Sequence, residues 1–248
     1  GTFSIDNANI DFYTKEMGGT VMRVGIISNQ FEPVNDNDDP NVINLEGFNY
    51  DAFDWDALKE LKSKGVEHFI LTSWSPPAWM KTNLSVDYYT AGYTKDTDNT
   101  DNRLEYSMYE EFAESMVAVV KAFKQHADID LLAIGLQNEP AFHEPYPSAI
   151  LGPDRFVEMI KVAGRRFKAE GLDTRFYMAE QVSNFVEDNT QYLDALQADT
   201  EANQYCDIFA IHGYGSDGIT PGQPNFTEWE NYRNNAAEGE YPKEVWMT

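Results

Sequence analysis

Cysteine is almost absent, since Cys206 is the one cysteine in 248 residues. A single thiol cannot close a disulfide within the chain, which excludes a disulfide-stabilised scaffold. The apolar residues that follow it predict a small buried side chain, so the redox compartment stays undetermined. Long apolar runs are also missing, and neither a membrane span nor a signal peptide is found. Because Gly1 is not a natural start, we expect an extracellular or periplasmic protein whose signal peptide preceded it.

Basic residues are scarce, with 18 lysines and arginines against 42 acidic residues and a net charge of −24. Such a surface repels nucleic acid and anionic membranes, so both are excluded as partners. A solvated surface explains most of the acidic surplus, which also fits a salty or extracellular setting. The composition does not indicate an oligomeric state.

Metal-binding patterns are missing as well. The histidines, His68, His126, His143 and His212, are dispersed without the spacing of metal ligands. The acidic run at 35–39 lacks the glycine and the distal glutamate of an EF-hand loop. We expect a solvated acidic turn there in preference to a surface Ca²⁺ site, and we predict no metal and no cofactor.

Strand-like and helix-like segments alternate along the chain, and no internal repeat is visible. This alternation predicts an α/β fold with a parallel sheet or barrel, and the length fits one large domain, 1–248. The predicted strands are 20–28, 67–73, 131–137, 174–179, 206–212 and 243–248. The predicted helices are 51–64, 106–126, 153–170 and 189–198. Long polar segments at 29–50 and 83–105 follow the first two strands, where a (β/α)8 barrel builds its substrate cleft.

The apolar run that begins at Leu131 ends in Asn138-Glu139-Pro140. Asn138 and Glu139 would be the first polar side chains at the C-terminal end of a buried strand, where parallel barrels carry their chemistry. An amide can hold a ring hydroxyl of a sugar while the neighbouring carboxyl exchanges a proton with a glycosidic oxygen. Taken alone, the motif fits an ordinary capped turn at least as well.

A second motif, at 73–83, has Trp74 and Trp79 on either side of Pro76-Pro77. The two prolines exclude helix, so we expect both tryptophans on a stiff loop and not in a packed element. Flat aromatic rings on a rigid rim are suited to stacking against sugar rings, with core packing as the alternative.

Together these motifs resemble the retaining glycoside hydrolases of clan A. The segment Ser73 to Asn83, followed by Gln137-Asn138-Glu139-Pro140, is most similar to family 30, which includes glucosylceramidases and β-1,6-glucanases. The runs at 146–148 and 211–215 fit the same pattern. Family 86, the β-agarases and porphyranases, is the alternative, because 139–146 and 179–181 resemble that group equally well. The resemblance covers 20–248 and does not distinguish the two families.

The resemblance implies a (β/α)8 TIM barrel in which the six predicted strands are the second to the seventh, so we expect the chain to be truncated at both ends. In this clan the nucleophilic glutamate follows strand seven, which is similar to Glu244-Val245-Trp246-Met247-Thr248 here. We therefore expect the nucleophile to be a glutamate immediately after Thr248.

The same resemblance assigns roles to individual residues. Glu139 is the expected general acid/base, and Asn138 is expected to bind the hydroxyl next to the anomeric carbon. Arg23 is a charge inside an apolar run, and its implied carboxylate partner is the nucleophile, whose pKa it would lower. The tyrosine that Tyr214 matches hydrogen-bonds the nucleophile in the family.

Weaker candidates lie close to other strand ends. His212, His143, Glu144 and Glu180 could each contact sugar from a cleft. Glu180 departs from the aspartate expected in family 30, which keeps family 86 open.

The predicted function is a retaining, endo-acting β-glycoside hydrolase whose partner is a β-linked glycan. An inactive carbohydrate-binding relative is the alternative from another class. An unrelated lyase or aldolase barrel is disfavoured because no Schiff-base lysine at a strand end and no phosphate-binding glycine loop is found in the sequence.

Overall fold

The computed structural model describes residues 7–87, 102–142, 146–183, 186–214 and 226–248. Its centre is a six-stranded parallel sheet in which every strand pairs with the one before it in the chain. The strands are β1 (Val21–Ile27), β2 (His68–Ser75), β3 (Leu131–Gly135), β4 (Arg175–Val182), β5 (Cys206–His212) and β6 (Glu244–Met247). All six predicted strands are therefore confirmed. Sequential parallel strands joined by helices are the architecture of a (β/α)8 barrel, of which this sheet forms a part.

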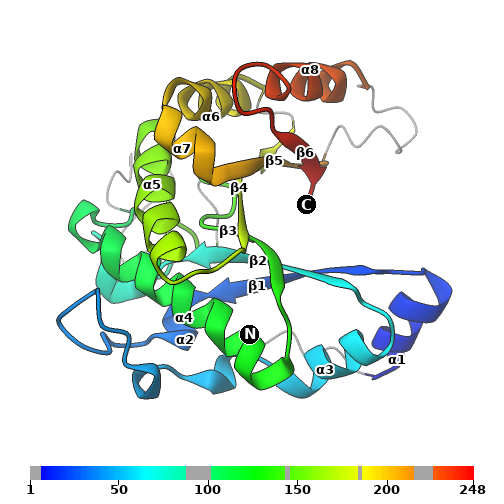
Figure 1. Ribbon diagram of the computed structural model, residues 1–248, viewed down its shortest axis with the longest axis vertical. Coiled ribbons are helices and arrows are strands. Elements are labelled where there is room, and N and C mark those ends of the chain that lie inside the picture. Colours follow the sequence, from blue (N-terminus) through cyan, green and yellow to red (C-terminus); the bar gives the residue numbers. More distant parts are fainter. Residues whose placement is uncertain (1–6, 88–101, 143–145, 184–185, 215–225) are drawn as a thin grey trace.

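Helices cover the outer side of the sheet, which curves from β1 round to β6 (Figure 1). The α-helices are α1 (Asn7–Asp11), α2 (Ser28–Phe31), α3 (Trp55–Ser63), α4 (Tyr109–Ala127), α5 (Pro153–Ala169), α6 (Val186–Ala198), α7 (Thr200–Tyr205) and α8 (Phe226–Ala236). Shorter turns of 3-10 helix lie at Leu45–Gly47, Tyr50–Ala52, Ala78–Met80 and Tyr106–Met108, with a π-helical turn at Phe12–Glu16. No helix in the described part of the chain has the length and apolar character to cross a membrane.

The four predicted helices are confirmed as α3 to α6, with their ends shifted by a few residues. The sequence did not predict α1, α2, α7 and α8. Of these, α1, α2 and α7 are too short to show a helical repeat of apolar residues. α7 begins where the side chain of Asp199 accepts a hydrogen bond from the backbone N–H of Ala202.

Two apolar clusters lie on the two faces of the sheet. The larger one fills the space between the sheet and the helices, and α4 contributes much of it. The smaller one lies on the inner face and consists of Ile70, Ala133, Tyr177, Ile208 and Ala210. Because successive side chains of a strand point to opposite faces, Thr72 and Trp74 lie on the same inner face as Ile70. This face therefore becomes polar toward the C-terminal ends of the strands.

Two local predictions were wrong. Trp74 belongs to β2 and not to the proline loop, since β2 continues through Ser75 and the prolines only follow it. Glu180 lies within β4 and not after it, because β4 continues to Val182 past a register shift between Ala179 and Gln181. Such an irregularity redirects a side chain without ending the strand.

Candidate active site

Glu139 lies four residues beyond the end of β3, in a loop held against β2. The backbone N–H of the neighbouring Asn138 donates to the carbonyl of Ser73 at 2.8 Å, and the side chain of Gln137 donates to the carbonyl of Trp74 at 2.9 Å. Glu139 has a φ of +42°, a conformation that is uncommon for a residue with a side chain. Asn138 and Glu139 are both buried. Backbone contacts between neighbouring strands thus place the amide and the carboxyl at the C-terminal end of the sheet.

The end of β3 is a glycine because two side chains from β4 occupy the space beside it. A Cβ atom on Gly135 would collide with the ring of Tyr177 and would lie 2.5 Å from Oε2 of Glu180. The Tyr177 hydroxyl donates to the carbonyl of Leu71 at 2.7 Å and lies 2.5 Å from the hydroxyl of Thr72. Because Gly135 has no side chain, Tyr177 and Glu180 can occupy the space beside the end of β3.

Arg23 and Glu180 form a buried ion pair across the inner face of the sheet. The Arg23 side chain donates to Oε1 of Glu180 at 2.7 and 3.1 Å, and also to Oδ1 of Asn138 at 2.8 Å. Burial alone would raise the pKa of Glu180, but the charges of Arg23 and His212 and the hydrogen bonds from Arg23 outweigh it, so the pKa is lowered. Glu180 is therefore ionised at neutral pH.

Among the described residues the carboxylate partner of Arg23 is Glu180, 157 positions away in the chain. The expected pairing of Arg23 with a nucleophile after Thr248 stays a prediction. The register explains the contact, because Arg23 pairs with Ile70 and so lies on the inner face, which Glu180 also reaches.

His212, the last residue of β5, lies between the two carboxylates. Its Nδ1 is 2.6 Å from Oε1 of Glu139, and its Nε2 is 3.7 Å from Oε1 of Glu180. The same Nε2 lies 3.4 Å from the Arg23 guanidinium. Burial would lower the pKa of His212, but its hydrogen bond to Glu139 and the nearby charge of Glu180 raise it overall. The imidazole thus connects the predicted acid/base to the buried ion pair.

The predicted tryptophans occupy different environments. Trp74 is half-buried on the inner face, with the Arg23 guanidinium 4.7 Å from its ring centroid. Together with Arg23 and Gly25 it lines a cavity of about 270 Å³. Trp79 donates from Nε1 to the carbonyl of Glu32 at 3.2 Å and packs against the larger apolar cluster. Trp74 therefore joins the group around Glu139, and Trp79 lies in a separate environment.

The other predicted residues are less closely associated with Glu139. Tyr214 is exposed, and its ring meets His212 edge-on with 5.7 Å between the centroids. His143 and Glu144 lie outside the described residues. Whether any of these side chains, or the two tryptophans, touches sugar stays a prediction.

Two members of the site were not predicted, namely Thr72 and Tyr177. Thr72 donates to Oε1 of Glu180 at 3.2 Å and accepts from Arg23 at 3.1 Å. The alternation of strand residues could have identified Thr72, because it lies two positions before Trp74 and shares its face. Tyr177 gives no such signal, since an apolar strand containing a tyrosine fits ordinary core packing.

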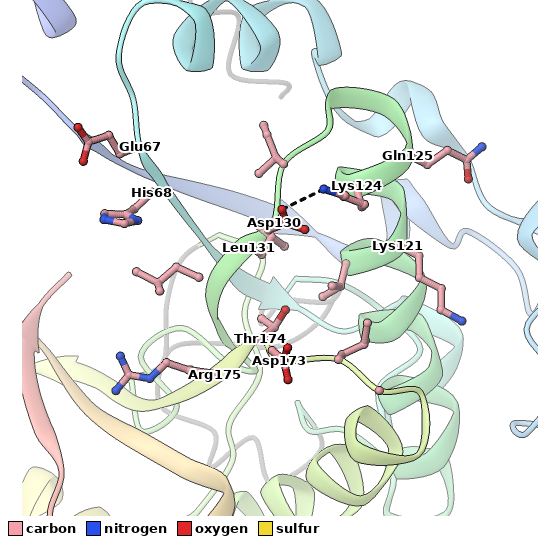
Figure 2. Close-up of a pocket in the computed structure, with 15 residues that line it drawn as sticks. Glu67, His68, Lys121, Lys124, Gln125, Asp130, Leu131, Asp173, Thr174 and Arg175 are labelled. Carbon is pink, nitrogen blue, oxygen red and sulfur yellow. Dashed lines mark hydrogen bonds and ion pairs between the residues drawn. The ribbon is translucent and has the colours of Figure 1, made fainter.

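A larger cavity lies at the opposite end of the sheet (Figure 2). It has a volume of about 700 Å³ and is lined by the beginnings of β2, β3 and β4, including His68, Leu131 and Arg175. Figure 2 shows Lys124 bonded to Asp130 on its wall. Barrel enzymes carry their chemistry at the C-terminal ends of the strands, so the group around Glu139 is the candidate active site.

Comparisons with known proteins support the barrel. No known family model and no curated protein matches this chain. Three solved structures are similar over almost all of it: a family 30 subfamily 8 xylanase from Clostridium acetobutylicum, an endo-β1,6-glucanase, and a family 30 endoxylanase from Clostridium papyrosolvens. In the same order, the TM-scores are 0.68, 0.71 and 0.67. The sequence identities are 23%, 23% and 21%, and the alignments cover 99%, 99% and 100% of this chain.

The shares of those structures that are covered are 52%, 54% and 53%, so this chain spans about half of their length. At these identities the similarity establishes the fold. The predicted resemblance to family 30, and the predicted partial barrel, are confirmed at that level.

Proposed function

We propose that this chain is part of a retaining, endo-acting β-glycoside hydrolase that cleaves a polysaccharide or glycoconjugate. The observation that carries the proposal is the position of Glu139, a buried carboxyl beside Asn138 and in contact with His212 at the C-terminal end of a barrel strand. The ends of β3 and β5 thereby bring polar and charged side chains to one small region, as general acid–base catalysis requires. Secretion is part of the proposal, because polymeric glycans lie outside the cell.

In the proposed mechanism Glu139 protonates the leaving oxygen and later removes a proton from water. The proton that Glu139 transfers has two adjacent sites, Oε1 of Glu139 and Nδ1 of His212, which lie 2.6 Å apart. The ionised Glu180 balances Arg23, so the net charge close to Glu139 stays low. Asn138, held by Arg23, is in place to bind the hydroxyl adjacent to the anomeric carbon.

A retaining mechanism needs a second carboxylate about 5 Å from the first. We propose that this nucleophile is a glutamate immediately after Thr248. β6 runs parallel to β5, and Met247 pairs with Ile211, directly before His212. A residue following β6 would therefore emerge at the same end of the sheet as His212.

The substrate could be a galactan of the agarose or porphyran type, as the resemblance to family 86 implies. The observation that favours it is Glu180, which stands where family 30 predicts aspartate and which is buried against Arg23. The structures with a similar fold are described as xylanases and an endo-β1,6-glucanase. Xylan, β-1,6-glucan, agarose, porphyran and glucosylceramide are thus the substrates to assay.

The test is Glu139→Gln in the complete protein, assayed on whichever glycan of this panel the wild type cleaves. Loss of the transferable proton should reduce turnover about 10²–10⁴-fold without unfolding the protein. Substrates with very good leaving groups should be affected less, because they need no proton. Glu67→Gln, an exposed carboxyl at the opposite end of the sheet, is the matched control and should retain full activity.

A folded Glu139→Gln protein with near-normal turnover on an unactivated glycan would refute the role of Glu139. A separate test is the residue after Thr248: without a carboxyl there, the nucleophile proposal is wrong and the inactive, carbohydrate-binding alternative is favoured. A carboxyl there about 9 Å from Glu139 would instead indicate an inverting enzyme. Oligosaccharide binding without turnover would identify a binding protein.

A further inference from the structure

Three carboxylates outside the candidate active site converge on one point. Oxygen atoms of Asp36, Glu111 and Glu114 all lie within 4.8 Å of one another. Glu111 and Glu114 are three positions apart on α4 and therefore share a helix face. Asp36 comes from the segment between α2 and α3, 75 residues earlier in the chain than Glu111. Tertiary packing thus places three negative charges together.

Several side-chain oxygens of this region are buried without a hydrogen-bond partner in the described part of the protein. Glu114 is only 1% exposed, and neither of its carboxylate oxygens has a hydrogen-bond partner in the described part of the protein. Buried oxygens without a partner also come from the residues around it, namely Glu32 Oε2, Asn35 Oδ1, Asp36 Oδ1 and Glu111 Oε2. Buried polar atoms are almost always paired, so this number of unpaired acceptors in one place points to a missing positive partner.

Glu32 is independent evidence, because it lies outside the group of three and is also 1% exposed. Asp36, Glu111 and Glu114 lie close enough to Glu32 to act on it electrostatically, and its Oε2 is buried without a hydrogen-bond partner. The four carboxylates therefore repel one another in a poorly solvated region.

Arg166 is the cation whose charge lowers the pKa of Glu114. Its own ion pair is with Glu170, at 3.2 Å from its guanidinium. No hydrogen bond between Arg166 and the carboxylate cluster is found among the described residues, and Nε of Arg166 is itself unpaired. Arg166 therefore compensates this negative charge only from a distance.

We propose that Asp36, Glu111 and Glu114 bind a calcium ion, with Glu32 and Asn35 supplying further oxygen ligands. Ca²⁺ takes six to eight oxygen ligands at about 2.3–2.6 Å, so oxygens around one ion are separated by up to about 5 Å. The 4.8 Å limit on the separations of the three carboxylates fits this range. Asp36 is held in place from its other oxygen, Oδ2, which accepts from the Asn44 backbone N–H at 2.6 Å and the Asn37 side chain at 2.8 Å.

This proposal departs from the sequence-based preference for a solvated acidic turn over a surface Ca²⁺ site at 35–39. The run at 35–39 supplies only Asp36 to the carboxylate group, and the other two members come from α4. A linear motif such as an EF-hand loop would not show this arrangement, because its ligands lie within one short segment.

The ion would connect the segment after β1 to α4 and to the turn that carries Trp79. Trp79 Nε1 donates to the carbonyl of Glu32, so the position of this ring depends on the segment that the ion would hold. Calcium binding at this cluster is independent of catalysis at Glu139, and its loss would be detected as lost stability before any effect on activity.

The experiment is a calorimetric titration of the complete, chelator-treated protein with CaCl₂ and, separately, MgCl₂, together with thermal unfolding at each concentration. We expect one Ca²⁺ site, weaker binding of Mg²⁺, and a rise in the unfolding midpoint of roughly 5 °C or more at a hundredfold excess over Kd. Absence of both Ca²⁺ heat and a Ca²⁺-dependent midpoint overturns the proposal and means that protons or Arg166 compensate the cluster. Mg²⁺ binding as tight as Ca²⁺ binding overturns the assignment to calcium.

Two variants locate the site. Glu114→Gln and Asp36→Asn should fold without metal, since each removes a repelled charge, and each should weaken Ca²⁺ binding at least tenfold and abolish the thermal shift. The matched control is Glu110→Gln, an exposed neighbour of Glu111 on the same helix, which should respond to Ca²⁺ like the wild type. If Glu114→Gln and Glu110→Gln respond equally, the ion binds elsewhere and the assignment fails.

Discussion

Buried charges in the candidate active site occur in compensating groups. Arg23 and Glu180 are both largely removed from water, with side-chain exposures of 24% and 1%. A buried charge pair is stabilising only while both partners remain, because each alone has a large desolvation cost. His212 extends the pair toward Glu139, so these side chains form one connected polar group.

The first residue-scale prediction concerns the Arg23–Glu180 pair. Glu180→Gln should destabilise the fold by about 3–5 kcal/mol, because it leaves the Arg23 charge buried without a counter-charge. The matched control is Glu201→Gln, which removes the partner of Arg165 in an exposed ion pair of similar length, 2.6 Å. Its effect should be much smaller. Free energies of unfolding from urea denaturation measure both, and equal losses would mean that Glu180 is not effectively buried.

The second residue-scale prediction is a pH dependence. The folded pKa of His212 is raised above 6.5, so its ion pairs stabilise the fold fully below pH 6.5 and progressively less as the pH rises through the folded pKa. The pKa of Glu180 is lowered below 4.5, so its contribution is present above pH 4.5 and lost as the pH falls below that value. Wild type and His212→Gln, compared by urea denaturation between pH 5.5 and 9, should differ most at the acid end. A difference that grows with pH would contradict the assignment.

Among the elements, β3 and β4 decide the shape of the site. β3 ends in Gly135, and β4 has its register shift next to Glu180. Gly135 leaves space beside the end of β3, and the register shift in β4 directs the carboxylate of Glu180 into that space. The position of Glu180 on the inner face therefore depends on Gly135, which has no side chain to fill the same space.

The element-scale prediction is that Gly135→Ala destabilises the fold by roughly 1–3 kcal/mol and displaces Tyr177 and Glu180, because the added methyl group overlaps both. Gly152→Ala is the matched control, since a Cβ there meets nothing within 4 Å and Gly152 has an ordinary φ of −60°. Its effect should be limited to a weaker start of α5. Denaturation with urea measures both variants, and an unchanged Gly135→Ala protein would show that the inner face is loosely packed.

At the scale of the whole molecule, charge is the dominant feature. The net charge of −24 means that folding brings many carboxylates together. Ion pairs such as Lys161 with Asp199, at 2.9 Å, compensate only part of it. The rest is subject to screening by salt.

We predict that raising NaCl from 20 to 500 mM increases the unfolding temperature, because the screening length falls from roughly 20 Å to about 4 Å and weakens the repulsion. The measurement is thermal unfolding in the presence of a chelator, so that bound calcium does not contribute. Choline chloride should act like NaCl, since screening depends on ionic strength and not on the cation. An unchanged or lower midpoint would show that attractive ion pairs outweigh the repulsion.

The sequence by itself determined the order of the strands and of the longer helices, and the position of Asn138 and Glu139 at the end of a strand. These follow from local patterns, namely short apolar runs, helical spacing in α4 and polar residues directly after a run. A local pattern needs no knowledge of distant residues.

Only the tertiary structure decided which side chains meet. Arg23 meets Glu180 because strand register places both on the inner face, and His212 meets Glu139 across 73 positions of the chain. Asp36 likewise meets Glu111 in the proposed calcium site because tertiary packing brings its segment against α4. Contacts of this kind depend on register, strand irregularities and helix packing, which are set by the whole fold and leave no periodic signal in the sequence.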